Sequence, residues 1–196
     1  MKKITKINNC RLCGSTDLKK ILDFGSVPLG NDLALNLKSS YSSETYKLQL
    51  NKCNNCGHYQ IGHEVHSKKL FATNYPYLTG IAPSFIRHFT KYSDWIIKQC
   101  NLKNNDIVLD VGSNDGTCLK AFKKRNLKVV GIDPASLPAK IANNNKIFTY
   151  SKFFNSKSAK RIKRDFGDID FITSHNVLAH VHNIRDVFEN IFFLLK

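Results

Sequence analysis

The sequence lacks the features of a membrane or secreted protein. No apolar stretch reaches the roughly 18 uninterrupted residues that a membrane-spanning helix needs. The start, Met1 to Lys6, is basic, but polar Asn8 and Asn9 follow where a secretory signal would have its apolar core. Internal repeats and low-complexity linkers are absent as well. With 42% hydrophobic residues among 196, the chain can form one medium and one small domain, and we expect a cytoplasmic protein with no membrane partner.

Acidic residues and arginine are both scarce. Asp and Glu number 15 against 30 Lys and Arg, which gives a formal net charge of +15, and only 6 of the 30 basic residues are Arg. Dense positive charge favours phosphate-containing partners such as nucleic acids. Proteins that recognise the edges of nucleic-acid bases, however, use the forked guanidinium group of arginine more than lysine. The lysines are also spread along the chain. A diffuse basic surface is the simpler interpretation, an anionic small-molecule partner is the alternative, and nucleic acid is less favoured.

Four of the six cysteines form two closely spaced pairs. The segments Cys10 to Gly14 and Cys53 to Gly57 share the pattern Cys-x-x-Cys-Gly. Two residues between cysteines let both sulfurs face one ion, and the following glycine tolerates the positive φ of such a turn. Two of these turns complete a closed, structural zinc site; a redox dithiol and unrelated free thiols are the alternatives. The predicted zinc ligands are Cys10, Cys13, Cys53 and Cys56.

The chain divides near residue 70. The cysteine pairs and short β-like runs precede this point, and the long gap between the pairs predicts an insertion that loops out of the zinc module. Beyond it, Phe85, Phe89, Tyr92 and Ile96 recur at steps of three and four residues, which predicts an amphipathic helix beginning near Pro83. The expected organisation is a zinc-binding module over 1–70, a linking segment with a helix over 71–104, and an incomplete α/β domain over 105–196.

From residue 105 onward, β-like and helical segments alternate, as in a parallel sheet with right-handed crossovers. The expected strands cover residues 106–111, 128–133, 146–150 and 170–175. Helices are expected through 125, near 135–143, through 164 and over 184–195. The predicted fold class is therefore α/β, a partial Rossmann-like sheet preceded by a small zinc-binding domain.

Four strand–helix units make only part of a doubly wound sheet. If the strands run in the usual order 3-2-1-4, the fourth strand has an apolar unpaired edge, which is prone to association. We therefore expect this edge to be covered by a partner chain or by a further part of a longer protein.

The segment 110–117, Asp-Val-Gly-Ser-Asn-Asp-Gly-Thr, lies where the first strand gives way to a helix. Asn114 breaks the Gly-x-Gly-x-x-Gly pattern and no Walker lysine follows, so a pyrophosphate fits poorly. Asp110 suits a ligand with a positively charged amino group. Gly112 and Gly116 leave space for an extended ligand that lies across the turn. Asp133 ends the next strand, at a position where a carboxylate binds ribose hydroxyls. An amino acid joined to adenosine is S-adenosylmethionine; a tight turn with a surface Asp is the alternative. The predicted contacts are Asp110, Gly112, Ser113, Asn114, Asp115, Gly116 and Asp133.

The chain resembles the bacterial sugar C-methyltransferases that modify nucleotide-linked deoxysugars. The resemblance spans the whole chain and is carried by the two cysteine pairs, by Pro-Leu-Gly-Asn at 28–31, Tyr-Pro-Tyr at 75–77, the loop at 108–117 and Asn-Val-Leu-Ala-His at 176–180. It implies a zinc-binding domain, a class I S-adenosylmethionine domain and a further C-terminal α/β domain. It also adds Asn176 to the cofactor contacts and implies a keto-deoxysugar on a nucleotide as substrate.

The resemblance implies that a base removes the proton from the carbon next to the ketone, which suits His or an activated Tyr. The family's leading candidates, a Tyr and a Glu-His pair in its later portion, have no counterpart in these 196 residues. The remaining candidates are His180, Tyr75 and Tyr77; a helix-start histidine and an aromatic clasp between domains are the simpler interpretations. We expect this chain alone to bind cofactor weakly and not to turn over.

Two other classes of function compete with a methyltransferase. A nucleic-acid-binding zinc protein would use the α/β half as a scaffold and would bind with steep salt dependence. A non-catalytic subunit or relic would complete its sheet with a partner chain and would migrate as a stable complex.

Overall fold

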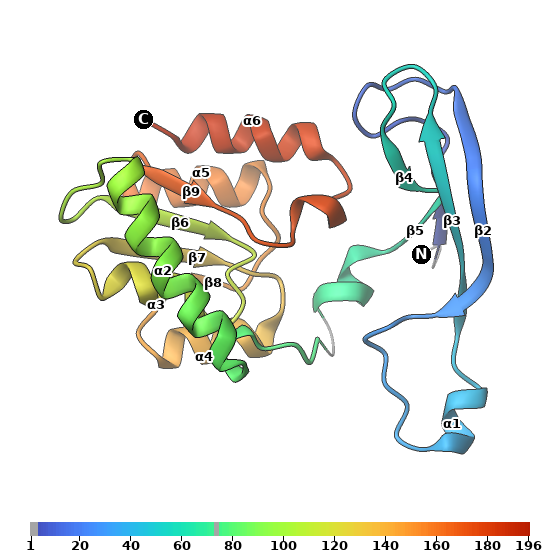
Figure 1. Cartoon of the computed structure of the whole chain (residues 1–196), viewed down its shortest axis with the longest axis horizontal. Coiled ribbons are helices and arrows are strands. Elements are labelled where there is room, and N and C mark those ends of the chain that lie inside the picture. The colour runs from blue at the N-terminus through green and yellow to red at the C-terminus, as the bar shows by residue number, and fades with distance from the viewer. Residues whose placement is uncertain (1–3, 73–74) are drawn as a thin grey trace. The chain divides into compact units, whose positions relative to one another are not determined.

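A computed structural model describes residues 4–72 and 75–196, and the basic start of the chain, Met1 to Lys3, lies outside them. The chain divides into two compact units between Tyr75 and Pro76 (Figure 1). Among the described residues, every helix is too short or too polar to cross a membrane.

The first unit consists of two small antiparallel sheets. Its elements are β1 (Ile4–Lys6), β2 (Leu18–Pro28), α1 (Leu37–Tyr41), β3 (Thr45–Cys53), β4 (Tyr59–Ile61), β5 (His63–Val65) and a π-helical turn, η1 (Lys68–Ala72). β1 pairs with β5, and β2, β3 and β4 form the second sheet in that order. The long β2–β3 hairpin is the insertion expected between the cysteine pairs.

The described part of this unit has little apolar core. Its buried hydrophobic residues are Cys10, Tyr46, Cys53 and Val65. Leu22 and Phe24 on β2 are 48% and 57% exposed, and Leu35 in the following loop is 98% exposed. A unit that buries so little apolar surface needs another source of stability, such as a metal site.

The second unit contains a four-stranded parallel sheet. Its strands are β6 (Ile107–Val111), β7 (Lys128–Ile132), β8 (Thr149–Tyr150) and β9 (Phe171–Thr173). They lie in the order β8-β7-β6-β9, all parallel. Numbered along the chain this is 3-2-1-4, so the predicted α/β fold class is confirmed.

The third strand is shorter than the predicted 146–150. The chain is still closing helix α4 (Ser136–Asn144) at this point, because the Ile147 N–H donates to the Ala142 carbonyl at 2.9 Å. Lys146 is held at a φ of 61°, in the left-handed region. Regular pairing with β7 therefore begins only at Thr149.

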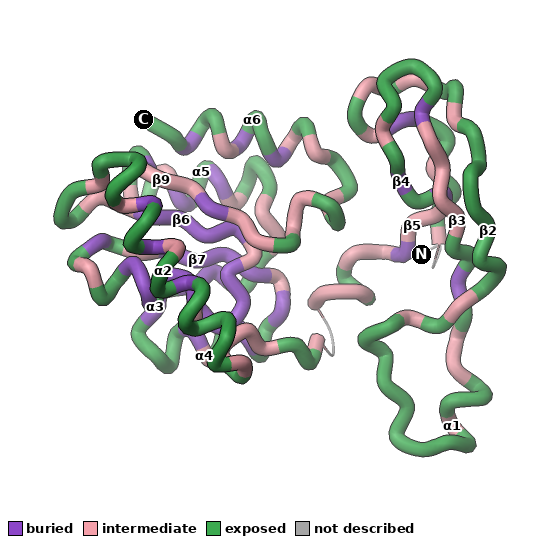
Figure 2. The backbone as a smooth tube through the Cα atoms, viewed as in Figure 1, coloured by how far each residue is buried: buried purple, intermediate pink, exposed green. Residues whose placement is uncertain are grey.

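Helices cover both faces of the sheet. The remaining helical elements are α2 (Pro83–Gln99), α3 (Thr117–Lys123), α5 (Ser156–Phe166), α6 (Ile184–Leu194) and the short 3-10 turns η2 (Thr79–Ile81) and η3 (Leu178–His180). Val108 packs with residues of α2, α3 and α4, whereas the next residue, Leu109, packs with α5 and α6. This alternation follows the two-residue period of a strand and places the sheet between two helical layers, with β6 and β7 mostly buried and β9 only partly buried (Figure 2).

The outer side of β9 is bordered by the last residues of the chain. Ile169 and Leu195 form an isolated parallel bridge. The Ile169 N–H donates to the Leu194 carbonyl at 2.9 Å, and the Lys196 N–H donates to the Ile169 carbonyl at 3.3 Å. The outer edge of the fourth strand, which was expected to be unpaired, is thus paired with the last residues of the chain at Ile169, just before β9 begins.

Candidate functional site

Two carboxylates lie at the ends of neighbouring strands. Asp110 in β6 is aligned with Gly131 in β7, and Asp133 directly follows β7. Asp110 is 2% exposed and Asp133 is 6% exposed. Burial, and after it the charge of Asp133, raises the pKa of Asp110 to about 8. The structure therefore brings these two predicted site residues together, as parallel strands with a common carboxyl edge should.

The loop after β6 is tied to β7 through Asp133. One carboxylate oxygen of Asp133 accepts from the Asn114 N–H at 2.8 Å, and the other accepts from the Ala135 N–H at 2.8 Å. These N–H groups lower the pKa of Asp133, but burial outweighs them and the pKa is raised. Asp133 thus has a fixed orientation, and each of its oxygens retains a lone pair for a further donor.

The two loop glycines are required by backbone conformation and by packing. Gly112 and Gly116 both have a φ of 78°, which disfavours other residues. A Cβ at Gly112 would lie 2.2 Å from Cγ2 of Val177, and one at Gly116 would lie 2.9 Å from Cγ2 of Ile147. The space beside the glycines, expected to be free for a ligand, is therefore filled by the chain's own side chains.

Two buried oxygen atoms near the loop have no hydrogen-bond partner among residues 4–72 and 75–196. They are Oδ1 of Asp110 and Oγ of Ser113. Leaving such an atom unpaired costs about 1 to 3 kcal/mol, so buried polar atoms are nearly always bonded. A ligand that donates hydrogen bonds would satisfy both. A positively charged amino group suits Asp110 in particular, because it would stabilise the ionised carboxylate.

The side chains of Asn114 and Asp115 contact protein groups. Oδ1 of Asn114 accepts from the Thr79 N–H at 2.9 Å, and its amide donates to the Tyr77 carbonyl at 3.0 Å. Oδ2 of Asp115 accepts from the Gly80 N–H at 2.7 Å. Both residues, predicted as cofactor contacts, therefore attach the segment at 77–80 to the loop, and sequence spacing did not reveal this.

The remaining candidates are distributed over both units. Asn176, with a φ of 56°, and His180 follow β9, and both are exposed. They lie beyond the same carboxyl edge as Asp110. Tyr77 in the second unit is 44% exposed. Tyr75 belongs to the first unit, where its ring packs edge-on against Phe71 with 5.9 Å between centroids.

A partly buried polar network that the sequence analysis did not identify lies close to Asp110. The Tyr92 hydroxyl is 2.9 Å from Oγ1 of Thr173, which is 2.9 Å from Nε2 of His175. Sγ of Cys118 is 3.8 Å from the same nitrogen. Burial raises the pKa of Tyr92 and of Cys118 and lowers that of His175, so all three groups are neutral at neutral pH. No sequence pattern predicts it, because its members come from α2, α3 and the end of β9.

In the first unit, four sulfur atoms gather at one point. The Sγ atoms of the four predicted ligands all lie within 4.8 Å of one another. Cys10 and Cys56 are 3.6 Å apart at Sγ, as are Cys13 and Cys53. Four sulfurs at the usual Zn–S distance of about 2.3 Å form a tetrahedron with edges of about 3.8 Å, so the cluster fits zinc.

The two cysteine turns have the same backbone geometry. Gly14 and Gly57 have φ values of 81° and 76°. Each glycine N–H donates to the carbonyl of the first cysteine of its pair, at 2.8 Å for Gly14 and 2.9 Å for Gly57. Hydrogen bonds from the Ser15 N–H and the Asn55 amide lower the pKa of the Cys13 thiol to about 6. The thiolate required by a metal is thereby favoured.

In a comparison with known proteins, two family models match this chain. One, described as a zinc binding domain, matches residues 10–71, and the other, described as a methyltransferase domain, matches residues 85–196. C-methyltransferase NovU of Streptomyces niveus is 28% identical over 192 residues, which are 98% of this chain and 46% of NovU. The chain thus spans about half the length of that relative.

Two solved methyltransferase structures show a partial similarity to this chain. The plantazolicin methyltransferase BpumL, in complex with a triazolic desmethylPZN analog and SAH, has a TM-score of 0.47 and 19% identity over 60% of this chain and 45% of its own. Magnesium protoporphyrin IX methyltransferase of Synechocystis PCC 6803, with bound SAM, has a TM-score of 0.44 and 12% identity over 57% of this chain and 54% of its own. The fold assignment rests on the strand order and the family model rather than on these partial likenesses.

Proposed function

The chain belongs to the methyltransferase domain family, and from that premise we propose that it binds S-adenosylmethionine and serves in the C-methylation of a nucleotide-linked keto-deoxysugar. The observation that carries the proposal is the buried Oδ1 of Asp110, which lies near Asp133 and has no hydrogen-bond partner in the described part of the chain. Both residues lie within the segment matched by the methyltransferase domain.

The chain's own residues would hold the methyl donor at the carboxyl edge of β6 and β7. Asp110 and Ser113 would accept from the amino group, and Asp133 would accept from the ribose hydroxyls. Asn176 and the loop backbone at Gly112 and Gly116 complete the proposed contacts, while Asn114 and Asp115 maintain the shape of the loop. When bound, S-adenosylmethionine supplies an electrophilic methyl group.

The reaction also needs a base. We propose His180 for this role, because it is exposed and follows the strand next to Asp110. Its imidazole would accept the proton from the carbon beside the ketone and leave the electron pair on the substrate as an enolate. Tyr75 and Tyr77 are the other candidates, in the segment that joins the two units.

The substrate class rests on two separate supports. C-methylation is suggested by the likeness to C-methyltransferase NovU. The nucleotide-linked sugar comes from the motif resemblance, and the net charge of +15 favours an anionic substrate. A partner chain or further domain that covers β9 remains part of the proposal.

Calorimetric titration with S-adenosylhomocysteine tests the donor site. We expect Asp133→Asn and Asp110→Asn each to weaken binding by about tenfold or more, since each removes a charged hydrogen-bond acceptor. Asp168→Asn is the control, because Asp168 is an exposed carboxylate of the same unit whose side chain pairs with Lys163. Absence of binding by the native chain, or equal binding by all three variants, would refute the site.

A further inference from the structure

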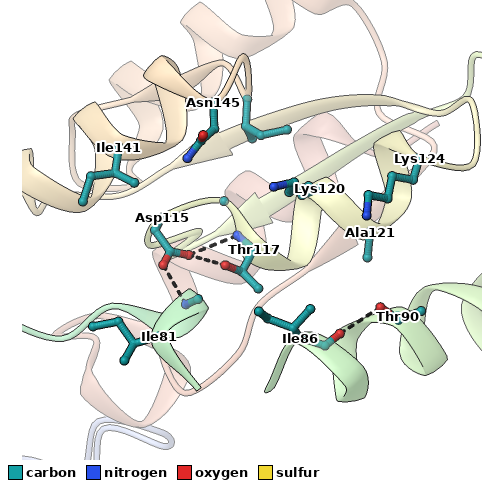
Figure 3. Close-up of a pocket in the computed structure, with 13 residues that line it drawn as sticks. Ile81, Ile86, Thr90, Asp115, Thr117, Lys120, Ala121, Lys124, Ile141 and Asn145 are labelled. Carbon is teal, nitrogen blue, oxygen red and sulfur yellow. Dashed lines mark hydrogen bonds between the residues drawn. The ribbon is translucent and has the colours of Figure 1, made fainter. Parts of the chain in front are cut away.

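A cavity of about 340 Å³ lies between α2, α3 and the end of α4 in the second unit (Figure 3). It is lined by apolar side chains and by two lysines, and it does not include Asp110 or Asp133. We propose that this cavity is a second small-molecule site, which binds a small organic anion with an apolar body. The proposal does not depend on methyl-donor binding.

Isoleucines form the apolar part of the cavity. Ile81 and Ile86 line one side and Ile141 lines the opposite side. Ile81 is 73% exposed and Ile86 is 46% exposed, so both present apolar surface to solvent around a hollow. A ligand that inserts an apolar body between these walls would remove that surface from water.

Cationic and amide groups form the polar part. Lys120 and Lys124 are four residues apart at the end of α3, on one side of the helix. Neither forms an ion pair with any residue in the described part of the chain. Asn145 lies on the opposite wall (Figure 3). Two ammonium groups and an amide that line the same cavity suit a phosphate or a carboxylate.

The carboxylate of Asp115 also lines the cavity, but both of its oxygens already accept hydrogen bonds from protein groups. Oδ1 of Asp115 accepts from the Thr117 N–H at 3.1 Å and from the Thr117 hydroxyl at 2.6 Å. Oδ2 accepts from the Gly80 N–H at 2.7 Å. With three donors around Asp115 and two free lysines opposite, the cavity carries a net positive charge.

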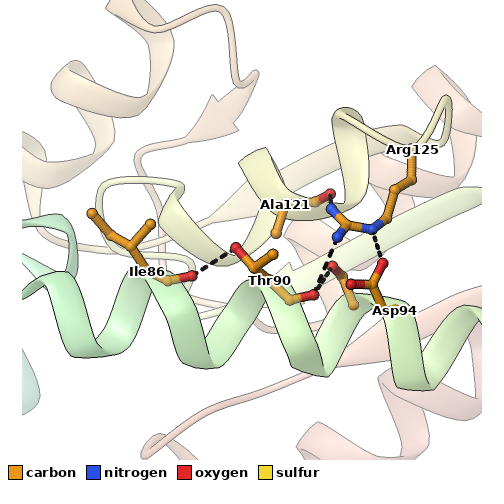
Figure 4. A network of polar contacts seen from close by, with 6 residues as sticks. Ile86, Thr90, Asp94, Ala121 and Arg125 are labelled. Atoms are coloured by element: carbon orange, nitrogen blue, oxygen red, sulfur yellow. Dashed lines mark hydrogen bonds and ion pairs between the residues drawn. The ribbon is translucent and has the colours of Figure 1, made fainter.

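The walls are held in place before any ligand binds. The Arg125 guanidinium donates to the Ala121 carbonyl at 2.9 Å and to the Thr90 carbonyl at 3.4 Å, and it pairs with Asp94 (Figure 4). Arg125 thereby joins α3 to α2, and Thr90 and Ala121 themselves line the cavity. The bond from Gly80 to Asp115 secures η2 in the same way. Binding to a preformed cavity requires little ordering of the protein.

An NMR titration of the full chain with phenyl phosphate tests this site. We expect saturable shifts of the amide signals of Gly80, Lys120 and Asn145. Inorganic phosphate lacks the apolar body and phenol lacks the charge, so each should bind about tenfold more weakly than phenyl phosphate. Equal affinity for phosphate and phenyl phosphate, or shifts spread evenly over the lysine-rich surface, would overturn the proposal.

A pair of variants separates the cavity from general charge attraction. The double variant Lys120→Gln, Lys124→Gln should weaken phenyl phosphate binding about tenfold, because both cations of the site are lost. The matched control Lys157→Gln, Lys160→Gln removes the same charge from exposed positions on α5 and should leave the affinity unchanged. If both double variants bind like the native chain, or lose affinity equally, no site exists here.

Discussion

The two units of the chain are stabilised by different means. In the first, four cysteine sulfurs gather at one point, and large hydrophobic side chains on the β2–β3 hairpin remain exposed. In the second, a parallel sheet carries an apolar cluster on each face, and Phe122, Leu109 and Ile162 are fully buried. We therefore expect the zinc module to depend on a bound ion for its fold and the methyltransferase domain to depend on packing. This difference leads to three predictions, in order of decreasing size.

The largest expected effect is on the first unit alone. Cys53→Ser removes one zinc ligand and should unfold residues 4–72, since structural zinc contributes on the order of 10 kcal/mol to small domains. Limited proteolysis should then cut within the first unit, while the fluorescence of Trp95, in α2, stays native. Cys100→Ser, at an exposed cysteine, is the matched control. A native cleavage pattern for Cys53→Ser would show that the ion is dispensable.

The second prediction concerns a substitution that should destabilise the second unit and leave the first unit intact. Phe122→Ala opens a cavity at a side chain that is 0% exposed, and should lower the free energy of unfolding of the second unit by roughly 4 kcal/mol. Denaturant unfolding followed by Trp95 fluorescence measures this change. Phe192→Ala, at a position that is 84% exposed, should have little effect. Zinc content should stay the same in both variants, and loss of zinc from Phe122→Ala would contradict independent folding.

The third prediction concerns the pH dependence of the stability of the second unit, in which the carboxyl group of Asp110 is buried. The pKa of Asp110 is raised to about 8 in the folded chain, above its unfolded value, so folding is favoured while the group is protonated. Stability is lost as pH rises through the folded pKa, by at most roughly 3 kcal/mol between pH 6 and pH 8 for one proton. Asp110→Asn should remove this part of the pH dependence.

The difference between native and Asp110→Asn unfolding free energies at pH 6 and pH 8 isolates the effect from the opposing titration of His175, whose pKa is lowered. Asp168→Asn should keep the native pH dependence. A native pH slope for Asp110→Asn would mean that this carboxyl is already ionised in the folded chain.

Much of the fold could be read from local patterns. The Cys-x-x-Cys-Gly segments predict the metal cluster because two residues between cysteines allow one local conformation, which the φ values of Gly14 and Gly57 show. Apolar runs followed by helical periodicity predict the parallel sheet, and the strand order matches the usual order that was assumed for it. Asp110 and Asp133 could be expected to meet because both end neighbouring strands.

Other features of the site could not be read in this way. The sequence suggested free space at Gly112, but Val177, 65 positions later, fills it. The hydrogen bonds from the Asn114 side chain to Thr79 and Tyr77 were not predicted, and its proposed contact with a ligand stays a prediction. The third strand was expected to begin at residue 146, but the end of α4 delays it to Thr149.

The sequence by itself therefore determined the cysteine turns, the alternation of strands and helices and the two acidic strand ends, because each depends on conformations and periods set by neighbouring residues. Only the tertiary structure decided that Val177 fills the space beside Gly112 and that Lys120 and Asn145 line one cavity. It also decided which polar atoms of Asp110 and Ser113 have no hydrogen-bond partner in the described part of the chain. These depend on side chains that are distant along the chain and meet only when the helices pack on the sheet. Local sequence patterns contain no information about such contacts.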